Sequence, residues 1–345
     1  MLLIFFESQA NLVTMTHSIS FKISFLTGLV LFTTSGYAQS IRGQVMDLAT
    51  RKPIMYVNIG IVGSPIGTIS NADGTFSITV PAHYSEESII FSMLGYAPRS
   101  IPVRELAGQS NNSVFLVEKT TRLETVTITE KQRKAKVYSL GNRYQKGGLI
   151  YCDSVAAGSA MALLIENKYP AYHKDLEFPL YAREARLFIS RNTLDSFKVR
   201  IRFLSRHPET GLPDDDIIDE SIVLTSSVRH GWITFDLKPY NLLISDTSFY
   251  LAFEWIMDDH DRLNLLRQYY EYRINNPDLV TSDTTIIAGE KVGVRNYHQF
   301  QAGTSYAVSP IPFSLQNYTC YYRLNSFGKW MRAPGILTAR VSMER

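Results

Sequence analysis

Few residues of this 345-residue chain have the types and the spacing that metal-binding or catalytic motifs require. His83 and Glu86 have the His-x-x-Glu spacing in which two side chains can ligate one zinc ion. A catalytic zinc site also needs a third protein ligand and a bound water, and His207 is the available candidate. No glutamate placed as a general base accompanies them, and His83 lies in a loop between two expected strands. The pattern favours a solvated loop, so we expect no metal, no cofactor and no enzymatic activity.

Acidic residues gather in one further stretch, Asp214–Asp216 with Asp219 and Glu220. Carboxylate oxygens are the ligands that Ca²⁺ prefers, so a calcium site is one interpretation. The spacing is not that of an EF-hand, and Gly211-Leu-Pro213 before it marks an ordinary loop. A solvated loop is the favoured interpretation.

Aromatic residues in the second half of the chain offer a third kind of chemistry, the stacking of a sugar ring. The candidates for such a ligand platform are Trp232, Tyr240, Trp255, Tyr269, Tyr270 and Tyr272. Aromatic residues in strands fill cores more often than they bind ligands, so burial in the core is the competing interpretation.

The two cysteines, Cys152 and Cys320, can form a disulfide if the chain enters an oxidising compartment. A bridge between them would close a long loop and contribute about 4–5 kcal/mol in the chain-entropy view. Two separate buried thiols are the alternative, because cysteine often serves as a small core residue.

Residues 1–38 are expected to be a signal peptide with its true start at Met15. The segment Phe21–Gly36 contains Lys22 followed by an apolar run, and Gly36-Tyr37-Ala38 supplies the small residues that precede cleavage before Gln39. A retained single-span anchor is the alternative, although the run is shorter than the ~20 apolar residues that a span requires. We therefore expect an exported protein of the periplasm, the outer-membrane surface or the medium.

Composition narrows the function classes. The chain has 35 basic and 32 acidic residues without a dense basic stripe, which argues against nucleic-acid binding. Tyr (20) and Phe (18) are abundant while helical periodicity is rare, which favours an all-β protein.

Residues 39–117 are expected to form a small seven-stranded sandwich, because short alternating segments recur with turn signals between them. The clearest segment is Gly67–Val80, where Asp73 and Gly74 predict a tight turn and Phe76, Ile78 and Val80 alternate with polar residues. We expect this segment to be a half-buried β-hairpin, and Gly95 to mark another turn.

The motifs of this region resemble those of the carboxypeptidase-regulatory-like domain, a transthyretin-like sandwich. They are Ile41-x-Gly43-x-Val45-x-Asp47, Pro53, Val57-x-Ile59, Gly67-Thr68, Asn71-x-Asp73-Gly74-x-Phe76 and Phe91-x-x-x-Gly95-Tyr96. Domains of this family stand beside zinc carboxypeptidases and at the N-termini of TonB-dependent outer-membrane receptors. The resemblance implies a fold and an interaction role, because the module carries no chemistry of its own.

Residues 118–148 are expected to be a linker made of one strand, Leu123–Thr129, and a basic run, Glu130–Lys136. A solvated linker is favoured over contact with anionic head groups. The ~200 residues that follow are too few for a plug and a 22-stranded barrel.

Residues 149–345 are expected to form a second all-β domain that resembles galactose-binding-like jelly rolls. Phe197, Val199, Ile201 and Phe203 alternate with charged residues, which predicts a strand with an apolar inner face and a charged outer face. One helix is expected over Asp261–Asn276, with its packed face formed by Leu263, Leu266, Tyr270 and Ile274.

The sequence therefore predicts an exported, non-catalytic binding or assembly protein of the cell envelope, whose partner is an envelope protein or a glycan. An accessory subunit of a zinc carboxypeptidase and a glycan-binding protein remain as alternatives. Each of these roles is compatible with association with the outer membrane. The sequence does not indicate the oligomeric state.

Overall fold

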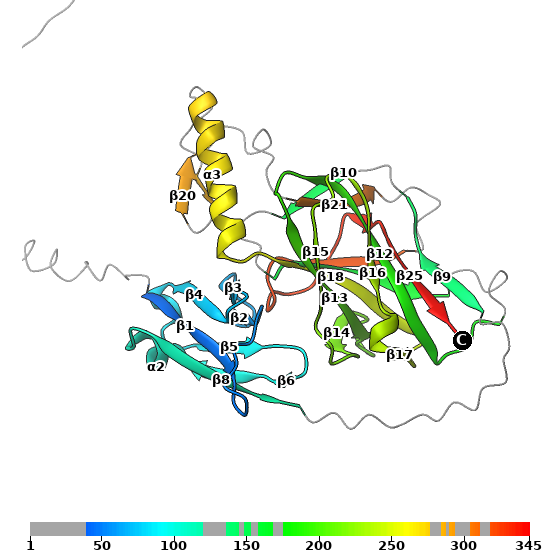
Figure 1. The fold of residues 1–345 in the computed structure, drawn as a ribbon, viewed down its shortest axis with the longest axis horizontal. Coiled ribbons are helices and arrows are strands. Elements are labelled where there is room, and N and C mark those ends of the chain that lie inside the picture. Colours follow the sequence, from blue (N-terminus) through cyan, green and yellow to red (C-terminus); the bar gives the residue numbers. More distant parts are fainter. Residues whose placement is uncertain are drawn as a thin grey trace, which may run out of the picture.

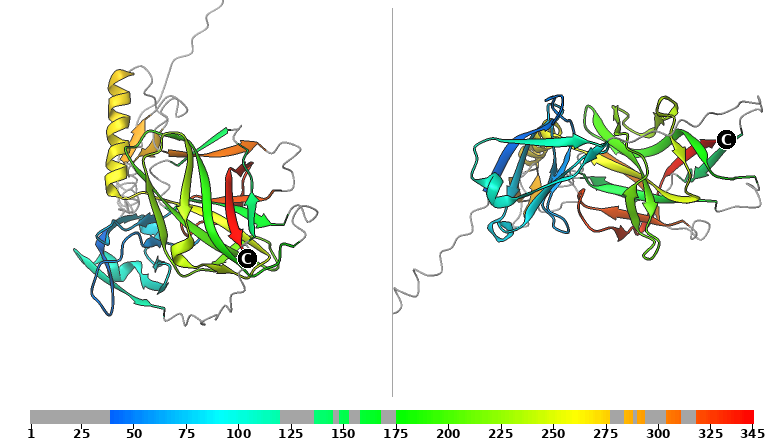
Figure 2. Two further views of the ribbon diagram at one scale, coloured as in Figure 1. Left: turned by 45° about the vertical axis from the view of Figure 1, so that its right-hand side comes forward. Right: turned by 90° about the horizontal axis from the view of Figure 1, so that it is seen from below.

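The computed structural model describes residues 39–119, 136–144, 148–152, 158–167, 175–276, 284–287, 290–293, 304–310 and 318–345. These residues form two β-sandwiches that lie side by side, with helix α3 rising from their junction (Figures 1 and 2). The predicted all-β class is confirmed. Within the described ranges, no helix is long and apolar enough to cross a membrane. The expected signal peptide, residues 1–38, lies outside them.

The first sandwich consists of two four-stranded sheets. One sheet has the order β4 (Thr75–Val80), β1 (Gln39–Asp47), β8 (Asn112–Glu118) and β6 (Tyr96–Ala97). The other has the order β3 (Gly67–Ile69), β2 (Asn58–Gly60), β5 (Ser88–Ser92) and β7 (Arg99–Pro102). The short helices η1 (Ala82–Tyr84) and α2 (Val103–Ala107) connect strands.

The core of this sandwich follows from the alternation along its strands. In β4, Phe76, Ile78 and Val80 are buried while the residues between them are not. The rings of Phe76 and Phe91 meet edge to face, 5.4 Å apart, so that one residue from each sheet fills the space between them.

The segment Gly67–Val80 is not the hairpin that its sequence predicts. Strand β3 pairs with β2, whereas β4 pairs with β1 in the other sheet. The turn between them therefore carries the chain from one sheet to the other. Its local chemistry follows the sequence: Gly74 has a φ of 75°, and the carboxylate of Asp73 accepts hydrogen bonds from the backbone and side chain of Thr75. Gly95, at the other expected turn, has a φ of 80°.

The second sandwich also has two sheets. The first contains β10 (Gly148–Cys152), β21 (Thr304–Pro310), β12 (Leu180–Asn192), β25 (Ala339–Glu344), β9 (Val137–Gly141), β16 (Gly231–Asp236), β17 (Leu243–Ile244) and β24 (Gly335–Leu337). The second contains β14 (Pro213–Asp216), β13 (Phe197–Arg206), β18 (Ser248–Ile256), β11 (Ala160–Glu166), β22 (Cys320–Arg323), β23 (Met331–Arg332) and β15 (Ile222–Ser226). A separate pair, β19 (Thr284–Ile287) and β20 (Glu290–Gly293), completes the strands, and η2 (Lys238–Tyr240) is a short helical turn.

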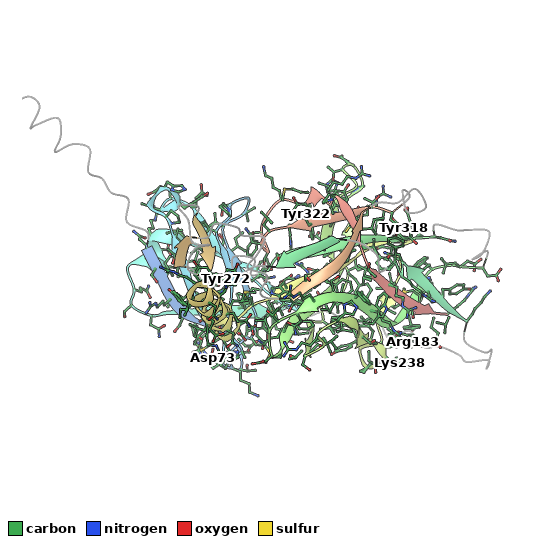
Figure 3. The ribbon with its side chains drawn as sticks, turned by 90° about the horizontal axis from the view of Figure 1, so that it is seen from above. Asp73, Arg183, Lys238, Tyr272, Tyr318 and Tyr322 are labelled. Atoms are coloured by element: carbon green, nitrogen blue, oxygen red, sulfur yellow. The ribbon has the colours of Figure 1, made fainter. Side chains whose placement is uncertain are left out.

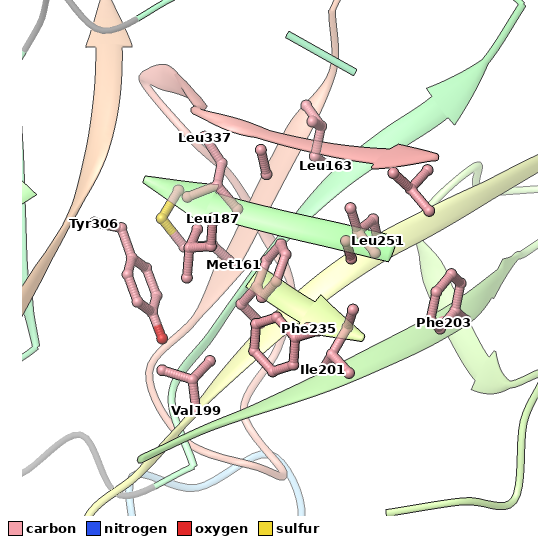
Figure 4. Packing of buried hydrophobic residues seen from close by; sticks show 14 of the residues in the cluster. Met161, Leu163, Leu187, Val199, Ile201, Phe203, Phe235, Leu251, Tyr306 and Leu337 are labelled. Atoms are coloured by element: carbon pink, nitrogen blue, oxygen red, sulfur yellow. The ribbon is translucent and has the colours of Figure 1, made fainter. Parts of the chain in front are cut away.

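Side chains of both sheets meet in a continuous apolar core. Val199, Ile201 and Phe203 from β13 face Leu187 from β12 and Leu337 from β24 (Figure 4). This is the inner face predicted for Phe197–Phe203. Packing of this kind between two sheets fixes which face of β13 is left for other contacts.

Strand β9 lies within the segment expected to be a linker. It pairs with β25 and is therefore an edge strand of the second sandwich. The expected strand Leu123–Thr129 and most of the basic run lie outside the described residues.

Helix α3 (Asp259–Asn275) is close to the predicted Asp261–Asn276, and Asp258 caps it by accepting a hydrogen bond from the backbone N–H of Asp261. The predicted packed face is wrong. Leu265 and Tyr269 are buried, whereas Leu263, Tyr270 and Ile274 are exposed and Leu266 is only partly buried.

Candidate functional site

The charged face of β13 lies against the first sandwich instead of facing solvent. Lys198, Arg200 and Arg202 alternate with the core residues, as expected, but Arg200 is only 1% exposed. The side chain of Arg200 reaches into the first sandwich, where its Nη2 donates to the carbonyl of Tyr56 at 2.6 Å and lies 3.7 Å from the sulfur of Met93. The face of β13 that was expected to point to solvent is therefore the centre of an interdomain contact.

Glu254 of β18 is the acceptor at this centre. It is fully buried and lies directly opposite Arg200 in the β13–β18 ladder, with its Oε1 3.1 Å from Arg200 Nη1. Its Oε2 is 2.9 Å from Arg202 Nη1 and 3.5 Å from Arg323 Nη2. Asn58 of the first sandwich hydrogen-bonds to the same carboxylate.

The charges in this cluster are not equal in number. Asp216 accepts from Arg202 at 2.8 Å, so that three guanidinium groups face two carboxylates. The ring of Trp330 lies 4.7 Å from the guanidinium carbon of Arg323 and offers a cation–π contact. Desolvation, together with Arg202, lowers the pKa of Arg323 to about 10.

The protonation state of Glu254 follows from the balance of two effects. Burial favours the neutral acid, but the attraction of Arg200, Arg202 and Arg323 outweighs it and lowers the pKa of the carboxyl group. Glu254 is therefore ionised at neutral pH. A buried carboxylate held in this way is costly to disrupt, because removing one partner leaves the others desolvated.

A second contact joins the turn of the first sandwich to α3. The side-chain oxygen of Asn71 accepts from the backbone N–H of Asp259 at 3.0 Å, and its Nδ2 donates to the carboxylate of Asp259 at 2.9 Å. Arg262, one turn further on, donates to Thr68 at 2.7 Å. One of the free N–H groups at the start of α3 is thus satisfied by a residue from the other sandwich.

A third contact joins the loop after β2 to the segment between β22 and β23. The backbone N–H of Gly63 donates to Phe327 O at 3.0 Å, and Asn325 Nδ2 donates to Ser64 O at 3.0 Å. A Cβ atom on Gly60 would lie 2.9 Å from the Phe327 ring, so this ring packs directly against the backbone of β2. The three contacts lie along one side of the first sandwich and hold it in a fixed orientation.

Next to the cluster lies the group of side chains best arranged for a metal ion among the described residues. Asp258, His260 and Asp261 place their ligand atoms within 4.8 Å of one another. The ammonium of Lys198 lies between the two aspartates, 2.9 Å from Asp258 and 2.8 Å from Asp261. Burial opposes its charge, but these hydrogen bonds outweigh burial and raise the pKa of Lys198. The position that a cation would take is thus filled by a side chain.

The zinc ligands considered from the sequence have other roles. His83 is exposed and its ring packs at a tilt against Tyr84, and Glu86 lies 3.9 Å from Arg104. His207 belongs to the second sandwich, where its Nδ1 accepts from the backbone N–H groups of the turn after β13. Of the acidic stretch, Asp216 belongs to the arginine cluster, while Asp214 and Asp215 are exposed.

The aromatic residues considered as one ligand platform lie in different places. Trp255 is core, 1% exposed and stacked on Phe197, and Tyr269 is buried. Trp232 is partly exposed on the outer face of β16, and Tyr240 is exposed in η2. In Figure 3, Tyr272 of α3 lies toward the end of the molecule that holds the first sandwich, and Lys238 of η2 lies toward the other end.

Cys320 is a free, buried thiol in the structure, and burial raises its pKa to about 12. This corresponds to the alternative of separate thiols. Cys152 lies in β10, in the other sheet of the second sandwich.

The central residues Glu254, Arg323 and Asn58 were missed by sequence reasoning. Glu254 carried a usable signal, because it is the single charged residue in the apolar run of β18. An ionisable group in a fully buried strand requires a partner, and Arg200 and Arg202 on the neighbouring strand were the available ones.

The two packed sheets and the separate apolar core of the first sandwich define it as a β-sandwich module of its own. Residues 41–128 match the sequence profile of the CarboxypepD_reg-like domain family. This part of the chain is therefore a carboxypeptidase-regulatory-like domain, the family that its motifs predict. The match leaves the second sandwich uncovered.

No curated protein matches the chain. Among solved structures, the "Structure of infectious bursal disease virus Gx strain" is similar at a TM-score of 0.22 and 9% identity, over 89% of this chain. The match spans only 60% of the viral chain. A likeness this weak carries no argument about fold or function.

Proposed function

We propose that the protein is an exported, non-catalytic binding or assembly protein of the cell envelope. The regulatory-like sandwich acts as its interaction module, and the second sandwich fixes the orientation of that module. The signal-peptide pattern of residues 21–38 supports export, and the resemblance to the N-terminal module of TonB-dependent receptors supports a place at the outer membrane.

One observation carries this proposal: the regulatory-like sandwich docks through only one of its two sheets onto the arginine cluster around Glu254. The residues that contact the second sandwich come from β2, β3, the loops around them and the turn after β5 that contains Met93. The sheet β4-β1-β8-β6 lies on the side away from the second sandwich and is left for a partner (Figure 1). Its outer face is polar, with Arg42 and Ser113 exposed on neighbouring strands.

The test is capture of partners from the native envelope by residues 39–345, followed by mass spectrometry. The variant Arg42→Glu with Ser113→Arg alters the outward sheet, and Arg267→Glu on the exposed side of α3 is the matched control. We expect one defined envelope protein to be retained by the wild type and the control and lost by the sheet variant. Peptide hydrolysis that His83→Ala abolishes would overturn the non-catalytic role, and equal capture by the sheet variant would overturn the assigned surface.

A further inference from the structure

A second surface lies on the outer face of the sheet that contains β12, β16 and β25, whereas the arginine cluster lies on the other sheet of the second sandwich. Leu187, Ile233 and Ala339 fill the core, so the residues next to them in each strand point to the other side of the sheet. There Arg186 of β12 stands directly opposite Arg340 of β25. Two residues further along β12, on the same face of the sheet, Phe188 stands opposite Trp232 of β16.

Like charges directly opposite each other on neighbouring strands repel. Arg186 is paired with Glu184, 2.5 Å away. In the described part of the chain, no carboxylate forms an ion pair with Arg340 or with Arg143, which lies beyond β9. Burial, followed by repulsion from Arg143 and Arg186, lowers the pKa of Arg340. The carboxylate of Glu184 acts on Arg340 in the opposite direction, so three guanidinium groups face one carboxylate here and positive charge is in excess.

An aromatic group stands beside this charge. The guanidinium carbon of Arg340 lies 5.4 Å from the centre of the Trp232 ring. The Trp232 ring packs edge to face on Phe188 at 5.3 Å, and Phe188 packs in the same way on His230 at 5.0 Å. His230 is itself fixed by a hydrogen bond between its Nδ1 and the carbonyl of Ser190. Trp232 is therefore held in position while remaining partly exposed.

We propose that Arg143, Arg186, Trp232 and Arg340, which we call the arginine–tryptophan face, bind a saccharide that carries acidic groups. The indole stacks against a sugar ring, and the guanidinium groups pair with its carboxylate, phosphate or sulfate. Two features select this class of ligand. Arg143 and Arg340, which have no ion-pair partner among the described residues, gain an anion that relieves their repulsion. A fixed, partly exposed tryptophan adds nothing to the binding of a small inorganic ion. The surface is separate from the partner face of the proposed function and does not depend on it.

The first test measures binding to residues 39–345 by tryptophan fluorescence and calorimetry. The probes are a galacturonic acid oligomer, a sulfated galactan oligomer, a glucosamine phosphate disaccharide, a neutral galactan oligomer and sodium sulfate. We expect at least one acidic saccharide to bind with an affinity that falls as salt rises, while the neutral oligomer does not bind. Which one binds identifies carboxylate, sulfate or phosphate as the acidic group. Absence of binding by all three, or equal binding of sodium sulfate alone, would overturn the proposal.

Three variants locate the site. Arg340→Gln should weaken binding more than tenfold, and the exposed Arg267→Gln on α3 should leave it unchanged. Trp232→Leu keeps an apolar cover on Phe188 but removes the stacking surface, so it should weaken saccharide binding as well. Equal binding by Arg340→Gln and the wild type would contradict the assignment.

Arg340→Glu gives a readout that does not depend on a ligand. The new carboxylate would lie opposite Arg186 and near Arg143, so the melting temperature should rise while saccharide binding is lost. A purely structural role for Arg340 predicts a lower melting temperature instead. That result would overturn the proposal even if binding also decreased.

Discussion

Glu254 is the single residue on which most of the interdomain contact depends. Its carboxylate faces three guanidinium groups and Asn58 while fully buried. Glu254→Gln keeps the shape but leaves those groups without a compensating charge, and we expect a loss of about 3–5 kcal/mol in the free energy of unfolding. Urea unfolding followed by circular dichroism measures it.

The matched control is Glu105→Gln, an exposed glutamate of α2. A substitution at such a site is expected to change the free energy of unfolding by less than about 0.5 kcal/mol. A loss at Glu254 no larger than in this control would show that the arginine cluster contributes nothing net to the contact.

Lys198 has a different role, because its ammonium occupies the place of a metal ion between Asp258 and Asp261. Lys198→Ala should destabilise the wild-type arrangement and at the same time expose a three-ligand site with His260. We expect Ca²⁺ or Zn²⁺ to raise the melting temperature of this variant and not that of the wild type. A similar metal-induced increase in the wild type would contradict the view that the ammonium excludes the ion.

At the scale of elements, the turn between β3 and β4 and the start of α3 form one unit. Asn71 supplies a capping contact to α3 from another domain. Asn71→Ala should cost about 1 kcal/mol, the usual value for a lost cap, and speed amide exchange in the first turn of α3. Hydrogen exchange measured by mass spectrometry tests this. Asp73→Ala, which breaks bonds only within the turn, should leave exchange in α3 unchanged; faster exchange there would contradict the prediction.

The same elements show how far the sequence leads. The alternation along β13 and β4 correctly predicts strands and their inner faces, because local period and burial agree there. The hairpin at Asn71–Gly74 was wrong because turn chemistry is local, whereas the choice of pairing partner depends on strands distant in sequence. The packed face of α3 was wrong for a related reason: Leu265 and Tyr269 are chosen by the neighbouring sheet, and hydrophobicity alone favoured Leu263 and Ile274.

The site was less predictable than the fold. A charged strand face such as Lys198–Arg202 has the same sequence pattern whether water or another domain covers it. Only the contact of the two sandwiches distinguishes these cases, and no local pattern encodes it. The isolated Glu254 within an apolar strand was the one residue from which the contact could have been inferred.

At the scale of the whole molecule, the two sandwiches are expected to behave as one rigid body at neutral pH. Three separate groups of hydrogen bonds connect them, and the central one is ionic and buried. Salt screens buried pairs far less than exposed ones. The contact should therefore resist salt and respond to acid.

The direction of the pH effect follows from the pKa of Glu254. Its pKa is lower in the folded protein than in the unfolded chain, so its contribution to docking is complete above the ordinary glutamate value of about 4.3. That contribution is lost as the pH falls through the lowered native value.

A specific protease site inserted after Thr129 would cut the covalent connection without touching the contact residues. After cleavage the two halves should co-elute in gel filtration at pH 7.5, in 0.1 M and in 1 M NaCl, and separate when the pH is lowered well below the ordinary glutamate value of about 4.3. In the Glu254→Gln protein, the two cleaved halves should separate already at pH 7.5. If the halves of the wild-type protein separated at neutral pH, the two sandwiches would be joined only by the linker and not docked.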